Sequence, residues 1–294
     1  MIGGIRLIKL NNDQYHKVID PLLSVDINIL FAQAVIKQKV PGSVFVDNEL
    51  SPRTFYISHS YGMSLLFGDV NNEEFKSILK GYILNSKKQR SKVEWLQAYP
   101  EAWNDEISEL CGSPMIESIS LGNNSAIPDN TDKIIKCTRV NFKFDSDFYK
   151  KAKDVLLEQN KKFSDSRLIE ISGTKEDTFL NMQGSVIPRF FWSSTESFNR
   201  VGAGFTLYYN GEPASTAFSA FVEDKKLEIG IETSEKFRGK GFAILVCSAL
   251  IEFCLEKGLE PVWACRLENT GSYRLAQKLG FVPTLHIPYY RLPV

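Results

Sequence analysis

The sequence predicts an α+β fold: a mixed, mostly antiparallel sheet flanked by helices, with an additional N-terminal α+β domain. Two patterns predict it. First, two apolar segments of strand character, residues 203–209 and 214–222, flank Asn210-Gly211, a dipeptide that tolerates the positive φ angles of a tight hairpin turn. Second, residues 241–257 carry apolar side chains at helical spacing, and Gly258 then ends the helix.

The other predicted elements of the C-terminal half follow from the same patterns. A third strand, 226–233, comes after a polar turn and completes a three-strand meander. The long helix is followed by a strand at 261–265, a helix at 272–279 that Gly280 ends, and a last strand from Phe281. Upstream of the meander, strands at 133–144 and 167–171 alternate with helices at 146–157 and 175–182.

The N-terminal half reads as a smaller α+β unit. It contains a helix at 26–37, strands at 42–46 and 53–57, and a helix at 72–84 capped by Asn72. Turn formers accumulate at 113–114 and 122–130, which places the domain boundary near 130 and gives domains 1–130 and 131–294. The strand-strand-helix order, with its run ending at 66–69, loosely echoes the later meander but lacks a glycine-rich loop. We interpret it as a degenerate copy, so one cofactor site per chain is expected.

Charge and composition exclude several classes of function. Thirty-five basic residues balance thirty-five acidic ones over 294 residues, so a nucleic acid or an anionic membrane is not expected as a partner. The basic run at 85–92 is interpreted as a solvated loop after a helix. No apolar stretch suits a signal peptide or a membrane span, and a cytoplasmic location is expected. Five cysteines without CxxC spacing and three scattered histidines predict no metal site. Cys247 and Cys254 are expected in the core.

The chemistry is predicted between the third strand and the long helix, in the segment Arg238-Gly-Lys-Gly-Phe-Ala243. A glycine-rich turn leaves the first amides of the helix unpaired, where they and the helix dipole can hold a diphosphate. Gly239 and Gly241 allow the backbone to approach a ligand closely, and Arg238 and Lys240 add positive charge. Taken alone, this short pattern also fits an ordinary glycine-rich turn into a helix.

This loop after a β-meander resembles the R/Q-x-x-G-x-G/A loop of the GNAT superfamily of N-acetyltransferases, which binds the pyrophosphate of acetyl-CoA. A second motif resembles that superfamily's late strand and the helix after it; its residues are 261–265, Asn269, Ser272 and 278–281. Together with Phe191-Trp192 and the cysteine-containing helix, the pattern is similar to the branch that includes zwittermicin A resistance proteins. The resemblance covers roughly residues 160–294.

The resemblance implies a splayed sheet that binds acetyl-CoA as cosubstrate, with no metal, and a small amine as acceptor. The backbone of Ile231 and Thr233 would contact the pantetheine and the acetyl carbonyl, and Asn269 would cap its helix and contact the thiol region with Ser272. The pyrophosphate site would be formed by Arg238, Gly239, Lys240, Gly241, Phe242 and Ala243. Direct attack of the amine on the thioester requires a base, donors for the tetrahedral oxyanion, and an acid for the departing thiolate.

The candidate catalytic residues are less well defined than the loop. Glu232 and Glu228 are the candidate bases, because alternation puts both on one face of the third strand; they could equally be ordinary strand carboxylates. Many family members carry a tyrosine seven residues after the motif asparagine, where this chain has Ala276. Tyr273, Ser272 and Tyr289 could replace that acid, although each also fits a packing or capping role. Trp263 and Phe281 are expected in the core.

Three functions therefore compete. The first is an N-acetyltransferase acting on the primary amine of a small or antibiotic-like acceptor. The second is a catalytically weak or inactive CoA-binding module with a regulatory or interaction role, which Ala276 favours. The third concerns the N-terminal domain, which could form a homodimer interface or close over the acceptor site.

Overall fold

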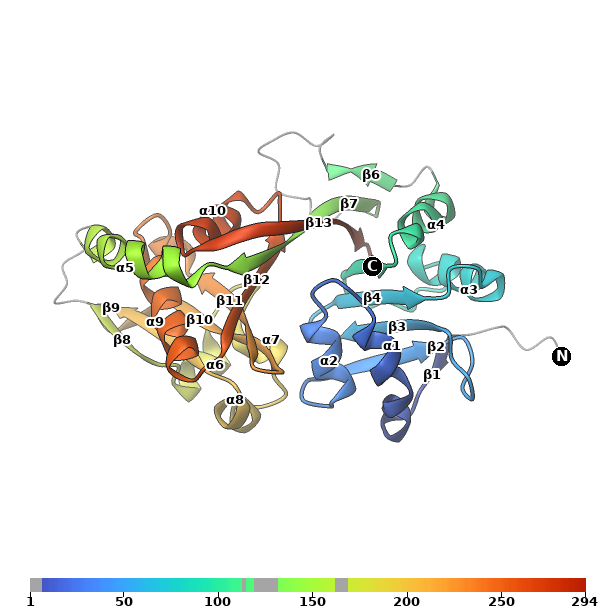
Figure 1. Cartoon of the computed structure of the whole chain (residues 1–294), viewed down its shortest axis with the longest axis horizontal. Coiled ribbons are helices and arrows are strands. Elements are labelled where there is room, and N and C mark those ends of the chain that lie inside the picture. Colours follow the sequence, from blue (N-terminus) through green and yellow to red (C-terminus); the bar gives the residue numbers. More distant parts are fainter. Residues whose placement is uncertain (1–6, 113–114, 119–131, 162–168) are drawn as a thin grey trace. The chain divides into compact units, whose positions relative to one another are not determined.

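A computed structural model describes residues 7–112, 115–118, 132–161 and 169–294. The chain divides into two compact units (Figure 1), each described here by itself. The first unit comprises Met1–Val140, Arg266–Glu268 and Leu285–Val294, and the second comprises Asn141–Cys265 and Asn269–Thr284. Most of the turn-rich segment that predicts a boundary near residue 130 lies outside the described residues.

The first unit is built on a sheet that begins β1-β2-β3-β4-β5. These strands are Ile8–Lys9, Gly42–Val46, Thr54–His59, Met63–Gly68 and Glu94–Tyr99. They pair antiparallel except for β4 and β5, which run parallel, and β5 pairs in turn with the end of β13, Phe281–Leu292. The short strand β6, Met115–Glu117, pairs parallel with the start of β7, Ile134–Phe144. The helical elements are η1 Asn12–Val18, α1 Ile19–Leu23, α2 Leu30–Ile36, α3 Glu73–Ile83 and α4 Ala102–Cys111.

The predicted elements of this unit are found with adjusted ends. The helix predicted at 26–37 is α2, which begins at Leu30; an Asx turn precedes it, in which the Asn28 side chain accepts a hydrogen bond from the Leu30 amide at 3.1 Å. Asn72 caps α3 as predicted, accepting from the Phe75 amide at 3.0 Å.

The prediction that the basic run at 85–92 is solvated is wrong for one residue. Arg90 is buried, and its guanidinium donates to the carbonyl oxygens of Ile83 at 3.0 Å and Pro293 at 2.7 Å. Since these carbonyls belong to the end of α3 and to the C-terminal segment, Arg90 ties the two together. A buried guanidinium needs such partners to offset the loss of hydration.

The second unit matches the predicted order of elements. Its sheet contains β12-β11-β10-β9-β8, which are Glu260–Arg266, Lys226–Thr233, Glu212–Glu223, Gly204–Tyr209 and Ile169–Gly173. All pairs are antiparallel except β11 with β12. The helices are α5 Ser146–Lys161, α6 Glu176–Asn181, α7 Pro188–Phe191, α8 Thr195–Val201, α9 Phe242–Glu256 and α10 Thr270–Lys278, with the 3-10 turn η4 at Glu235–Phe237. At the predicted hairpin turn, Asn210 and Gly211 have φ angles of 53° and 79°.

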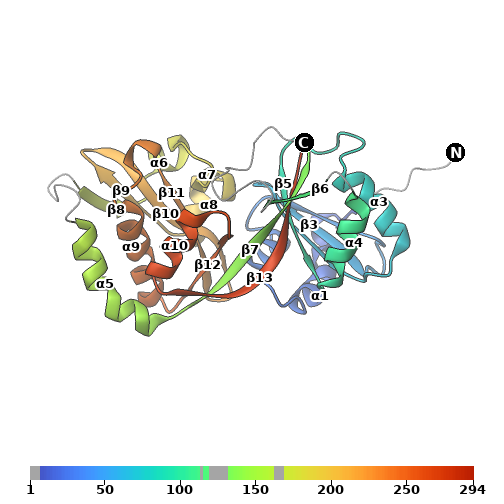
Figure 2. The same cartoon turned by 90° about the horizontal axis from the view of Figure 1, so that it is seen from above.

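Helix α9 lies between the sheet and α5, as both cartoon views show (Figures 1 and 2). Phe253 packs edge to face on Phe205 of β9, with ring centroids 6.1 Å apart. On the other side, the Lys153 ammonium of α5 lies 3.1 Å from the Glu252 carboxylate. This double cover explains why α9 is apolar on more than the single face that its spacing predicts. Across all described residues, no helix combines the length and apolar character needed to cross a membrane.

All five cysteines are free and buried, including the predicted core residues Cys247 and Cys254. Burial raises the pKa of Cys111 and of Cys137 to about 11 and that of Cys254 to about 12. A two-unit rise lowers the reactive thiolate fraction about 100-fold. We therefore expect negligible reaction of the native protein with a thiol-specific chromogenic reagent at pH 8. After unfolding, the reagent should release five equivalents of chromophore per chain. Rapid release of chromophore by the native protein would contradict the burial of these thiols.

Candidate active site

The sheet of the second unit opens between β11 and β12. The two strands pair over only three positions, from Lys226↔Glu260 to Glu228↔Val262. Strand β10, in contrast, stays paired with β11 up to Ser215↔Thr233. From Ile229 onward β11 therefore has a ladder partner on one side and an open edge on the other. Free backbone donors and acceptors at such an edge can bind an extended ligand.

The glycine-rich loop follows this open edge. Gly239 and Gly241 have φ angles of 78° and 76°, in the left-handed region that favours glycine. Gly241 is the residue that caps α9, and Phe242 begins the helix. The first amides of α9 therefore point out of its N-terminus without intrahelical partners, together with the positive end of the helix dipole.

Two cations flank these amides. The Lys240 ammonium lies over the rings of Tyr209 and Phe237, 5.2 and 5.4 Å from their centroids. The exposed Arg238 side chain donates from Nε to the Thr233 carbonyl oxygen at 3.2 Å. Phe242 is buried, so it can offer a ligand only its backbone amide. Amides at a helix N-terminus and two cationic residues in one loop are the kinds of group that can bind a diphosphate.

The second predicted motif lies at the N-terminus of α10. Asn269 caps this helix by accepting from the Ser272 amide at 3.1 Å. The Ser272 hydroxyl accepts from the indole of Trp263 at 3.2 Å, and Trp263 is buried as predicted. Phe281 is buried against Trp263, with ring centroids 5.4 Å apart.

The candidate acids have different surroundings. The half-buried Tyr273 ring packs edge to face on Phe142, 5.4 Å between centroids. Ala276 is fully buried. Tyr289 belongs to the first unit, where it stacks on Trp95 at 5.3 Å. Of the three hydroxyls, those of Ser272 and Tyr273 therefore lie in the unit that carries the loop.

Glu228, Gly230 and Glu232 share one face of β11 because strand side chains alternate. A Cβ atom at Gly230 would lie 2.5 Å from the Phe218 ring, so the Phe218 side chain occupies this face too. Both carboxylates are buried, which makes them unusual strand residues rather than solvent-facing ones. Alternation alone could not reveal their burial.

The contacts of Glu232 extend beyond its strand. Its Oε2 atom accepts from the amides of Ser185 at 2.9 Å and Val186 at 3.0 Å. Its Oε1 atom lies 3.4 Å from the Arg238 guanidinium. No sequence signal marks residues 184–186, because a short loop without charged residues or periodicity does not indicate that it binds a distant carboxylate.

The first unit repeats the same element order. Strands β2, β3 and β4 are followed by α3, the parallel strand β5 and α4. Here β4 and β5 stay paired over five positions, from Met63↔Trp95 to Phe67↔Tyr99. The edge that is open between β11 and β12 is therefore closed in this unit.

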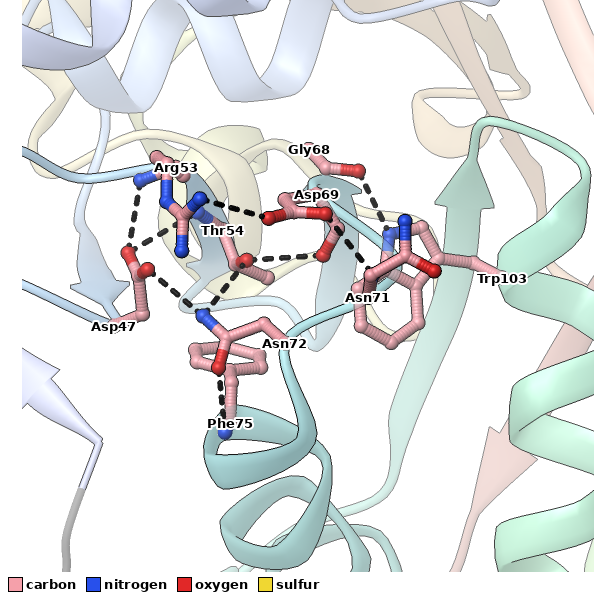
Figure 3. A network of polar contacts seen from close by, with 9 residues as sticks. All are labelled: Asp47, Arg53, Thr54, Gly68, Asp69, Asn71, Asn72, Phe75 and Trp103. Atoms are coloured by element: carbon pink, nitrogen blue, oxygen red, sulfur yellow. Dashed lines mark hydrogen bonds and ion pairs between the residues drawn. The ribbon is translucent and has the colours of Figure 1, made fainter.

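Asp47 and Asn72 (Figure 3) line a pocket at the N-terminus of α3. Asn72 caps the helix, and its Nδ2 donates to the Asp47 carboxylate at 2.8 Å. Asp47 also accepts from the amides of Arg53 at 2.9 Å and Thr54 at 3.1 Å. Glu73 and Glu74 occupy the first turn of α3. The carboxylates around this helix end would repel a diphosphate.

Comparisons with known proteins agree with this architecture. Residues 24–290 match the model of a family described as GNAT acetyltransferase. The uncharacterized N-acetyltransferase YdfB of Bacillus subtilis (strain 168) is 26% identical over 251 residues, which cover 85% of each chain. The crystal structure of a GCN5-related N-acetyltransferase-like protein from Streptococcus suis 89/1591 covers 96% of this chain and 99% of its own, with a TM-score of 0.65 and 20% identity.

A tandem GNAT protein from the clavulanic acid biosynthesis pathway is similar over 97% of both chains, with a TM-score of 0.55 and 8% identity. At these identities the two solved structures show the fold alone. They confirm the predicted α+β fold and extend it to a tandem GNAT-like arrangement, in which the first unit repeats the fold of the second.

Proposed function

Because this chain belongs to the GNAT acetyltransferase family, we propose that it transfers the acetyl group of acetyl-CoA to a primary amine of a small-molecule acceptor. One observation carries the proposal: the loop 238–243 presents helix amides, two positive-φ glycines and two cations directly after the open edge of β11. Arg238, Gly239, Lys240, Gly241, Phe242 and Ala243 would hold the pyrophosphate. The open edge at Ile231 and Thr233 would hold the pantetheine, with Asn269 and Ser272 near the thiol.

Acetyl-CoA supplies an activated acyl group as a thioester. Transfer forms a bond between the amine nitrogen and the acetyl carbon and breaks the carbon–sulfur bond. One proton must therefore leave the nitrogen, and one must reach the sulfur. Holding both substrates in one ternary complex would supply much of the rate.

We assign the proton acceptor to Glu228. It is buried on the face of β11 at the last position paired with β12, where the sheet begins to open. Glu232, the stronger candidate from the sequence, has an oxygen that already accepts two backbone amides. Tyr273 is proposed as the proton donor to sulfur, since its hydroxyl lies on the helix that follows β12.

Several finer assignments remain proposals drawn from the sequence. These are the zwittermicin A resistance-type branch, a cytoplasmic location, the domain limits of 1–130 and 131–294, and a homodimer formed through the N-terminal domain. We likewise propose that neither a nucleic acid nor a membrane is a partner.

The test is calorimetric titration of acetyl-CoA into the full chain, followed by a screen of primary amines for CoA release. We expect one acetyl-CoA per chain, with micromolar affinity, because among the described residues it is the second unit that places a glycine-rich loop after an open strand edge. Two equivalent sites per chain would contradict the expectation that the carboxylates at the N-terminus of α3 repel a diphosphate. Failure of the folded protein to bind acetyl-CoA would refute the proposal, and binding without turnover would favour the alternative of an inactive CoA-binding module.

A further inference from the structure

Glu232 joins two segments that are far apart in the sequence. Its Oε2 accepts from the Ser185 and Val186 amides at 2.9 and 3.0 Å, and from the Ser185 hydroxyl at 3.4 Å. Its Oε1 accepts from the Arg238 guanidinium of the glycine-rich loop at 3.4 Å. Only 9% of the side chain is exposed. Charge-assisted hydrogen bonds in such a place are stronger than those in water.

Gly184 fits closely against this carboxylate. An added Cβ atom would lie 2.5 Å from Cγ of Glu232 and 2.6 Å from Cδ and Oε2. The residue also has a φ angle of 142°, which residues other than glycine rarely adopt. The backbone at Gly184 and the Glu232 side chain are thus in close contact, with no room between them for a further carbon atom.

The segment that Glu232 holds covers one face of the sheet. We call residues 183–192 the covering segment. Near its end, Phe191 packs edge to face on Phe218 at 5.4 Å and on Phe221 at 5.7 Å, and the Trp192 indole donates to the Ser219 carbonyl oxygen at 2.7 Å. Since Phe218 shares its face with Gly230, the covering segment lies on the same face as Glu228, opposite α9.

We propose that Glu232 is a positioning residue that fixes the covering segment to the glycine-rich loop 238–243. We further propose that the covering segment forms a wall of the acceptor site. This inference rests on the proposed function. An amine must approach the acyl group from one face of the opened sheet, and α9 occupies the other face. The covering segment therefore limits the approach of the acceptor, and the hydrogen bonds to Glu232 fix the position of this segment.

The experiment combines kinetics with hydrogen exchange on the full chain. Glu232→Gln keeps an oxygen for the two amides but removes the charge that faces Arg238, whereas Glu232→Ala removes both. Gly184→Ala displaces the carboxylate from the opposite side. Gly211→Ala is the matched control, because Gly211 also has a positive φ angle, 79°, but has no atom within 4 Å of an added Cβ.

We expect Glu232→Gln to raise the acceptor KM roughly tenfold with kcat within about threefold, and to leave the pH profile of kcat unchanged. Glu232→Ala and Gly184→Ala should raise KM further and speed exchange of the Ser185 and Val186 amides. Gly211→Ala should change none of these values.

Three outcomes overturn the proposal. A kcat loss above about 100-fold in Glu232→Gln, with loss of the acidic limb at unchanged KM, would make Glu232 the base. Fast exchange of both amides in the wild type, or exchange that Glu232→Ala leaves unchanged, would show that the anchor does not hold the segment, whatever the enzyme does. Slow exchange that Glu232→Ala abolishes, in a wild type that turns over no amine, would refute the proposed function and the acceptor wall together while leaving the anchor in place.

Discussion

Replacing Gly239 by leucine should weaken acetyl-CoA binding at least about 100-fold, which corresponds to roughly 2.7 kcal/mol. Gly239 has a φ angle of 78°, and an added Cβ meets no protein atom within 4 Å. A leucine there would therefore be tolerated by the fold apart from about 1–2 kcal/mol of backbone strain. Its side chain would instead project into the space that the pyrophosphate needs. Calorimetric titration of acetyl-CoA measures the effect.

The chain offers a matched control at the other end of α9. Gly258 has a φ angle of 63° and likewise no atom within 4 Å of an added Cβ. Gly258→Leu carries the same kind of backbone strain and should bind acetyl-CoA like the wild type. If both variants bind normally, the loop does not hold the cofactor; if both lose binding, the loss reflects unfolding, which circular dichroism detects.

The second unit could be predicted from the sequence because its signals are local. The Asn210-Gly211 turn, the apolar strand segments on either side of it, and the apolar helix ended by Gly258 each lie within about 20 residues. Element order and approximate ends follow from such patterns alone. The candidate diphosphate loop at 238–243 could also be proposed from the sequence, because its residues are contiguous, and its role stays a prediction.

Strand β5 could not be found in the same way, because buried polar residues interrupt its pattern. The Glu94 carboxylate lies in the core, where Tyr56 donates to it at 2.6 Å and Tyr82 at 2.5 Å. The buried Gln97 donates to the Asn28 carbonyl oxygen at 3.1 Å. Buried polar groups need hydrogen-bond partners. Here those partners lie 12 or more residues away in the sequence. A hydrophobic pattern does not report those partners.

The same limit applies to the carboxylates of the site. Alternation correctly places Glu228 and Glu232 on one face of β11, yet their different surroundings depend on residues elsewhere in the chain. The Ser185 and Val186 amides make Glu232 an anchor, although they stand 46 or more residues away from it. The strand pattern does not report such contacts, so it cannot choose the base between the two carboxylates.

Replacing Glu228 by glutamine should lower kcat about 100- to 1,000-fold, the range expected for loss of a general base. The substitution keeps the shape of the side chain at a position where only 5% of the residue is exposed, so acetyl-CoA binding should stay within about twofold of wild type. The acidic limb of the kcat/KM profile should disappear, because that limb reports deprotonation of the base in the free enzyme. Steady-state kinetics between pH 5 and 9 measure both effects.

Glu223→Gln serves as the matched control, since Glu223 is another strand carboxylate in the same unit and is only 1% exposed. It should retain kcat and the acidic limb, which would separate proton transfer from the general effect of neutralising a buried strand carboxylate. If Glu228→Gln kept more than about half of kcat with the wild-type profile, the proton would leave through another group or directly to water. Because Glu232 is already bonded to two amides, water would then be the better candidate, and rate acceleration would depend on how the loop and the covering segment orient the two substrates.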